Sequence, residues 1–136
     1  MKRKVGLIFW FVMLFLVLVS CIGDASAQLD GTAWRLVTYG GKYVIPGSSP
    51  TLFFENGSVG GNASCNNFGG NYQARGSQLI IGETAWTLMA CADNQLMEQE
   101  NAYMQLLDQT DRFEFINGQL VITTAAGEKL IFDRIE

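Results

Sequence analysis

The stretch that decides the fold is RFEFINGQLVITT, at residues 112–124. Phe113 and Phe115 alternate with charged residues, and a second apolar run follows directly after Asn117-Gly118. Alternation with a period of two is typical of a strand with one buried face. An Asn-Gly pair supplies the two positive-φ positions of a tight hairpin turn. The stretch therefore predicts an antiparallel β-hairpin with an apolar face.

Short strands of the same kind are predicted along most of the remaining chain. Asn56-Gly57 marks a second hairpin turn, and glycine pairs or loop residues separate the other apolar runs. The predicted strands are 32–39, 51–55, 58–64, 72–75, 78–81, 112–116, 119–124 and 129–134, with a further extended piece at 84–89.

One helix is predicted between residues 93 and 111, a segment without Gly or Pro. Asp93 or Asn94 is suited to cap its first turn. The sequence thus predicts an α+β domain, an antiparallel and strongly twisted sheet with one helix packed over it. The sheet would form a partial barrel of about eight short strands, with the helix over its open mouth. The apolar face of the helix would consist of Leu96, Met97, Tyr103, Met104 and Leu107.

The N-terminal segment has the pattern of an export signal. Three cationic residues at positions 2–4 precede an uncharged apolar run over 5–19, as in a secretory signal peptide. This run is shorter than the roughly 20 apolar residues of a transmembrane helix. We therefore expect residues 1–27 to be a signal peptide and residues 28–136 to form a single domain.

Two processing sites overlap within that signal. Ala25-Ser26-Ala27 fits ordinary signal peptidase, which would release a soluble secreted protein. Residues 18–21, LVSC, resemble a bacterial lipobox in which Cys21 is acylated. We favour lipidation of Cys21, so the expected location is the cell envelope, with the membrane reached through an N-terminal lipid.

Composition excludes several classes of function. The chain contains no histidine, which excludes a Ser–His–Asp triad, a Cys–His pair and histidine metal ligands. Residues 28–136 carry 6 Lys and Arg against 12 Asp and Glu, a net charge of −6. This acidic balance argues against nucleic acid as a partner.

Two cysteines remain once Cys21 is acylated or removed. An even pair in an exported domain favours a disulfide between Cys65 and Cys91. The bridge would connect the sheet to the start of the helix. The alternative is two buried free thiols.

Few other residues suggest chemistry. Glu98 and Glu100 could form an acidic pair, but residues two apart on a helix point in different directions, so we expect both to be solvated. Asn66, Asn67 and Asn71 could line a polar ligand loop. The competing interpretation is that this Asn- and Gly-rich stretch supplies positive-φ positions around a turn.

Four ordered segments resemble the META domain family of HslJ-like heat-shock proteins. They are 32–36, 51–60, 65–72 (CNNFGGNY) and 87–91 (TLMAC), followed by an acidic helix. Ser64 departs from the pattern, because the family often has Gly before this cysteine. The resemblance implies a small envelope or secreted domain, often a lipoprotein, associated in bacteria with heat shock.

These observations lead to a functional expectation. We expect a non-catalytic, stress-related, surface-anchored domain that binds an unknown envelope protein or small ligand, without enzymatic activity, cofactor or metal. The alternative is a small secreted protease inhibitor or peptide-binding module that uses a strand edge or the asparagine-rich loop.

Overall fold

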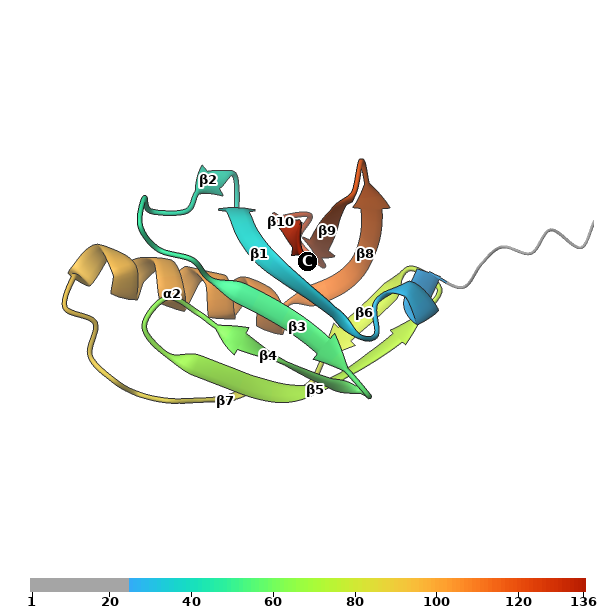
Figure 1. The fold of residues 1–136 in the computed structure, drawn as a ribbon, viewed down its shortest axis with the longest axis horizontal. Coiled ribbons are helices and arrows are strands. Elements are labelled where there is room, and N and C mark those ends of the chain that lie inside the picture. The colour runs from blue at the N-terminus through green and yellow to red at the C-terminus, as the bar shows by residue number, and fades with distance from the viewer. Residues whose placement is uncertain (1–24) are drawn as a thin grey trace, which may run out of the picture.

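An antiparallel β-barrel dominates the computed structural model, which describes residues 25–136 (Figure 1). The predicted lipobox at 18–21, including Cys21, lies outside the described residues. The elements, in chain order, are η2 (Ala25–Gln28), β1 (Thr32–Tyr39), β2 (Lys42–Tyr43), β3 (Thr51–Glu55), β4 (Ser58–Asn62), β5 (Asn67–Arg75), β6 (Gln78–Ile81), β7 (Ala85–Trp86), α2 (Asn94–Asp108), β8 (Thr110–Ile116), β9 (Gln119–Thr124) and β10 (Lys129–Ile135).

Eight of these strands follow one another around the barrel. Their order is β1-β3-β4-β5-β6-β8-β9-β10, and every pairing is antiparallel. The predicted class and strand number are therefore confirmed. The prediction left the barrel partial, whereas the observed barrel is closed. Its closure comes from the pairing of β1 with β10, from Ala33↔Ile135 to Tyr39↔Leu130. The neighbouring barrel strands with the fewest paired residues are β6 and β8, which share the single pair Gln78↔Arg112.

Both predicted Asn-Gly turns are confirmed. Asn56 and Gly57 have φ of 50° and 79°, and Asn117 and Gly118 have φ of 51° and 81°. These are the left-handed positions that a type I′ hairpin turn requires. The turns place β3 beside β4 and β8 beside β9.

Several strand boundaries differ from the prediction: β4 ends at Asn62 rather than at residue 64, β8 begins two residues earlier than expected, and β10 ends one residue later. β5 begins at Asn67 rather than at residue 72, and β7 covers only Ala85–Trp86 instead of 84–89. The short strand β2 was not predicted. Asn and Gly are depleted in strands, which is why the sequence pattern does not reveal the start of β5.

The barrel interior and the inner face of α2 form one apolar core. Trp34 of β1 is 1% exposed. Tyr103 of α2 makes ring contacts with Phe68 of β5 and Phe132 of β10. The helix therefore closes the barrel interior, and it runs directly into β8 (Figure 1).

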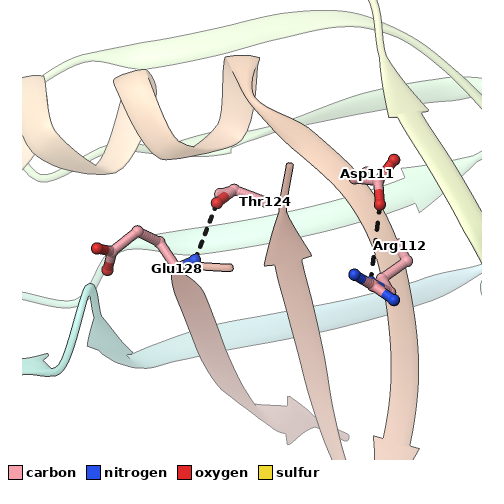
Figure 2. Close-up of polar contacts among 4 residues, drawn as sticks. All are labelled: Asp111, Arg112, Thr124 and Glu128. Carbon is pink, nitrogen blue, oxygen red and sulfur yellow. Dashed lines mark hydrogen bonds and ion pairs between the residues drawn. The ribbon is translucent and has the colours of Figure 1, made fainter. Parts of the chain in front are cut away.

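Thr124 fixes the turn between β9 and β10. Its Oγ1 accepts a hydrogen bond from the backbone N of Glu128 at 3.0 Å (Figure 2), and its own backbone N donates to the carbonyl oxygen of Glu128 at 2.9 Å. In the same view Asp111 and Arg112 form an ion pair at 3.7 Å on β8. Both of these charged side chains are well exposed, so their ion pair contributes little to stability.

Gly61 provides a test of how closely the strands are packed. A Cβ added there would overlap the carbonyl oxygen of Thr51 and lie 2.7 Å from the Thr51 carbonyl carbon. Gly61→Ala is therefore expected to lower the free energy of unfolding by about 2–3 kcal/mol. The matched control is Gly69→Ala, where the nearest atom to the added Cβ is 3.9 Å away. Equal midpoints for the two variants in urea unfolding would contradict the close approach.

Alkaline pH is expected to destabilise the domain through Tyr103. Its hydroxyl donates to the Thr51 carbonyl oxygen at 3.2 Å, and burial raises its pKa well above the ordinary value of 10.0. Above pH 10 the unfolded state ionises while the folded state does not, so the free energy of unfolding falls by about 1.4 kcal/mol per pH unit. Below pH 10 this contribution is fully present.

Denaturant unfolding between pH 8 and pH 11.5 measures this effect. Tyr103→Phe is expected to lower the free energy of unfolding by about 1 kcal/mol at pH 8. Its free energy of unfolding is also expected to fall less steeply above pH 10 than that of the wild type. Tyr43→Phe removes an exposed hydroxyl and is expected to retain the wild-type decline. An unchanged slope in Tyr103→Phe would contradict the role of burial.

Candidate functional site

A disulfide between Cys65 and Cys91 joins the barrel to the segment before α2. The two Cα atoms are 5.6 Å apart, within the range of ordinary bridges. Cys65 follows β4 and Cys91 precedes the N-cap Asp93, whose side chain accepts a hydrogen bond from the backbone N of Gln95 at 2.8 Å. The predicted pairing, and Asp93 as the helix cap, are both confirmed.

Glu100 of α2 is buried beside this bridge, contrary to the expectation that it is solvated. It is 3% exposed. Its Oε2 accepts hydrogen bonds from the backbone N of Cys65 at 2.9 Å and of Asn66 at 2.8 Å. Its Oε1 accepts from Asn66 Nδ2 at 2.5 Å. Three donors therefore compensate the burial of this carboxylate, whereas Glu98 is exposed as expected.

The side-chain amide of Asn66 holds the 87–91 segment in place. Its Nδ2 also donates to the Met89 carbonyl oxygen at 3.0 Å, while its Oδ1 accepts from the Met89 backbone N at 2.7 Å. The Thr87 hydroxyl donates to the same Oδ1 at 2.8 Å. Asn66, Glu100 and the disulfide thus form one polar clamp around the start of β5, which we call the Asn66–Glu100 clamp.

Gln99 extends the clamp toward a second loop. Its Nε2 donates to Ser48 Oγ at 2.9 Å and to Ser64 Oγ at 2.8 Å, and its Oε1 accepts from the Ile45 backbone N at 2.7 Å. This buried amide therefore ties the loop between β2 and β3 to α2.

The three predicted ligand asparagines do not gather into one site. Asn66 is buried and occupied by the contacts above. Asn67 and Asn71 are exposed on β5, where Asn67 Oδ1 accepts from Asn62 Nδ2 at 3.1 Å. The polar ligand loop suggested by the sequence is thus divided between an interior clamp and an exterior strand.

The expected positive-φ positions are also placed differently. None of residues 65–71 has positive φ, and the strained position is Ser64, with φ of 147°. This conformation favours glycine, which gives a physical reason for the glycine that is frequent at this position in the resembled family. Serine at position 64 therefore holds a backbone conformation that favours glycine, and its hydroxyl accepts the hydrogen bond from Gln99.

A cavity of about 490 Å³ lies between the connection from β6 to β7 and the C-terminal half of α2. Its apolar lining residues Ile81 and Met104 are buried, whereas its two carboxylates are exposed and so lie toward its rim. Trp86 of β7 packs against the core and is half-buried at this cavity. The lining residues are Ile81, Gly82, Glu83, Thr84, Trp86, Met104 and Asp108.

The sulfurs and the carboxylate of the clamp do not form a fitting metal site. Cys65, Cys91 and Glu100 bring three ligand-type atoms within 4.8 Å of one another, the one such group among residues 25–136. The sulfurs are bonded to each other, so neither is the thiolate that metals bind. The carboxylate already accepts three hydrogen bonds.

Gln99 and Glu100 are buried polar residues that the sequence prediction missed. The available signal was helical spacing, because steps of three or four residues back from Leu107 and Tyr103 reach both positions. When the buried face of a helix is predicted from its apolar residues alone, these two polar positions are left out. The buried face of α2 contains Gln99, Glu100, Tyr103, Met104 and Leu107.

The fold and the clamp together define a small disulfide-stapled barrel domain with a single α-helix in its described part. The META domain family model matches residues 27–136, so the chain belongs to the META domain family. In the part of the chain that the structure covers, no helix has the length and hydropathy needed to span a membrane.

Individual relatives agree with this assignment. Heat shock protein HslJ of Escherichia coli (strain K12) is 28% identical over 122 residues, covering 85% of this chain and 86% of HslJ. It is a distant homologue. The NMR structure of a protein from Burkholderia xenovorans has a TM-score of 0.67 and 27% identity, covering 82% of this chain and 86% of that one.

A more remote likeness extends to the fold alone. The crystal structure of a DUF4847 family protein from Bacteroides vulgatus ATCC 8482 has a TM-score of 0.57 at 12% identity. It covers 80% of this chain and 96% of that chain.

Proposed function

We propose that this META domain is a non-catalytic binding domain of the cell envelope that acts under stress. The observation that carries the proposal is the clamp, in which Cys65, Cys91 and Glu100 are committed to holding the fold. A nucleophile requires an activating base, and the chain has no histidine to supply one. Similarity to a protein named a heat shock protein supports the stress role.

The envelope location rests on the N-terminal sequence. Residues 18–21 place Cys21 at the end of the apolar run, and an acyl chain there would hold the domain at a membrane face. Mass spectrometry of the mature N-terminus tests this, with an acylated Cys21 as the expected first residue. Gln28 as a free N-terminus would overturn the lipid anchor and support a secreted form.

The binding role is tested by capture from envelope extracts, combined with an activity panel on the purified protein. The expected result is a recovered partner or ligand and no turnover of ester, peptide, glycoside or phosphate substrates. Turnover that survives further purification would overturn the non-catalytic role.

The alternative of a strand-edge inhibitor or peptide-binding module finds less support. Barrel closure pairs β1 with β10 and so removes the free edges of the first and last barrel strands, to which an extended peptide could otherwise add. Among the barrel strands, the edges of β6 and β8 that face each other are the most sparsely paired. Within residues 25–136 the short strands β2 and β7, of two residues each, pair on one side only. Recovery of a protease in the capture experiment would favour this alternative.

A further inference from the structure

We propose that the groove between α2 and the β6–β7 connection binds a small organic cation, namely a protonated amine carried on an apolar body. This inference rests on the proposed binding function and names a class of ligand for it. Three features of the groove support it: a fixed wall, an apolar floor and an uncompensated negative rim.

The wall of the groove is held against β5 at both ends. The backbone N of Gly82 donates to the Asn71 carbonyl oxygen at 2.8 Å. The backbone N of Thr87 donates to the Asn67 carbonyl oxygen at 3.0 Å. Between them β7 pairs with β5 at Phe68↔Trp86. The wall is therefore formed before a ligand arrives, which lowers the entropic cost of binding.

Gly70 of β5 allows this wall to approach so closely. A Cβ at Gly70 would lie 2.8 Å from the carbonyl oxygen of Glu83. Any larger residue would push the connection, and with it the Glu83 backbone, away from the sheet. The position of Glu83 at the groove thus depends on a glycine in the neighbouring strand.

The floor of the groove matches an apolar ligand body. Ile81 and Met104 are buried, and Trp86 is half-buried. The volume of about 490 Å³ lies within the range of small-molecule sites, roughly 300–1,000 Å³. An indole ring is also the best aromatic partner for a cation.

The rim selects the sign of the ligand charge. Glu83 and Asp108 are the charged lining residues, and neither forms an ion pair within residues 25–136. Asp108 is the last residue of α2, where the helix dipole is negative, and the last turn contains no basic residue. An acidic residue at this end of a helix is unfavourable for folding. A cation in the groove would be attracted by both carboxylates and by the helix end, whereas an anion would be repelled.

Titration with phenethylammonium tests the proposal, with 2-phenylethanol as its neutral isostere. The readout is the indole N–H resonance of Trp86 in NMR spectra of the purified protein, assigned with Trp86→Phe. We expect saturable binding of the amine, at least about tenfold tighter than the alcohol and weaker at 0.5 M salt. Absence of saturation, or equal affinity for the two probes, would overturn the inference.

Charge variants locate the binding site. Glu83→Gln and Asp108→Asn are each expected to weaken amine binding about fivefold. The control Glu55→Gln removes an equal charge from an exposed position on β3 and is expected to leave affinity unchanged. Equal losses in all three variants would indicate a general field effect and overturn the groove as the site. Thermal melts of each variant identify any that fail to fold, and Asp108→Glu, which retains the charge, is expected to bind as wild type.

The inference and the proposed function fail in different ways. Capture of an envelope partner without amine binding would remove the inference and leave the proposed function intact. Amine binding accompanied by turnover of the amine would overturn the non-catalytic role. Binding of a lysine-rich peptide without binding of the free amine would overturn the small-ligand claim.

Discussion

Replacing Glu100 by alanine is expected to lower the free energy of unfolding by about 4 kcal/mol. The substitution leaves the backbone N–H groups of Cys65 and Asn66 and the Asn66 amide without their acceptor. Each buried donor that loses its acceptor costs about 1–3 kcal/mol. Chemical denaturation followed by circular dichroism measures the loss.

Two variants make this prediction specific. Glu98→Ala, two residues earlier in α2, removes an exposed carboxylate and is expected to change stability by less than about 0.5 kcal/mol. Glu100→Gln keeps one acceptor oxygen for the two backbone donors but presents an NH₂ group to Asn66. We therefore expect it to lose about half as much stability as Glu100→Ala. Similar stabilities of Glu98→Ala and Glu100→Ala would contradict the clamp.

Removing the disulfide is expected to lower the free energy of unfolding by about 3.5 kcal/mol. The bridge closes a loop with a sequence separation of 26 residues, and the chain-entropy relation gives about this value for a loop of that length. The Cys65→Ser and Cys91→Ser variants, melted under oxidising conditions, measure the cost. Wild-type protein treated with a reductant is expected to melt at a similarly reduced temperature.

The double variant separates a bridge from two independent packing contacts. If the two sulfurs act as one unit, Cys65→Ser/Cys91→Ser is no less stable than either single variant. Additive losses would instead indicate independent side chains. The backbone N of Cys65 donates to Glu100, so the disulfide and this carboxylate hold the same segment. We therefore expect the Glu100 and Cys65 substitutions to be non-additive as well.

Local sequence patterns were sufficient to predict the hairpins and the helix. Asn56-Gly57 and Asn117-Gly118 adopt the expected backbone conformation, and Asp93 caps α2. Closure of the barrel could not be predicted in this way, because it depends on the pairing of β1 with β10, from opposite ends of the domain. The prediction also made β5 too short. Glycine is disfavoured in strands, but Gly70 is needed in β5 because a Cβ there would meet the carbonyl oxygen of Glu83.

The candidate site was only partly predictable for a similar reason. Counting cysteines identified the Cys65–Cys91 bridge, because an even pair of cysteines behind an expected export signal favours a disulfide. The role of Glu100 depends on donors 34 and 35 residues away, which no local pattern reveals. The groove likewise combines residues from β6, β7 and α2 that no motif connects.

The pairing of the first barrel strand with the last affects how the chain folds. Ala33 of β1 meets Ile135 of β10, so the barrel cannot close until nearly the whole chain is available. Contacts between distant residues raise the contact order, and barrels of this kind fold in milliseconds to seconds rather than microseconds. A chain still being synthesised lacks its closing strand and leaves β1 without that partner. Completion of the fold therefore waits for the strand Lys129–Ile135, which leaves an interval in which the earlier strands are made but the barrel is still open.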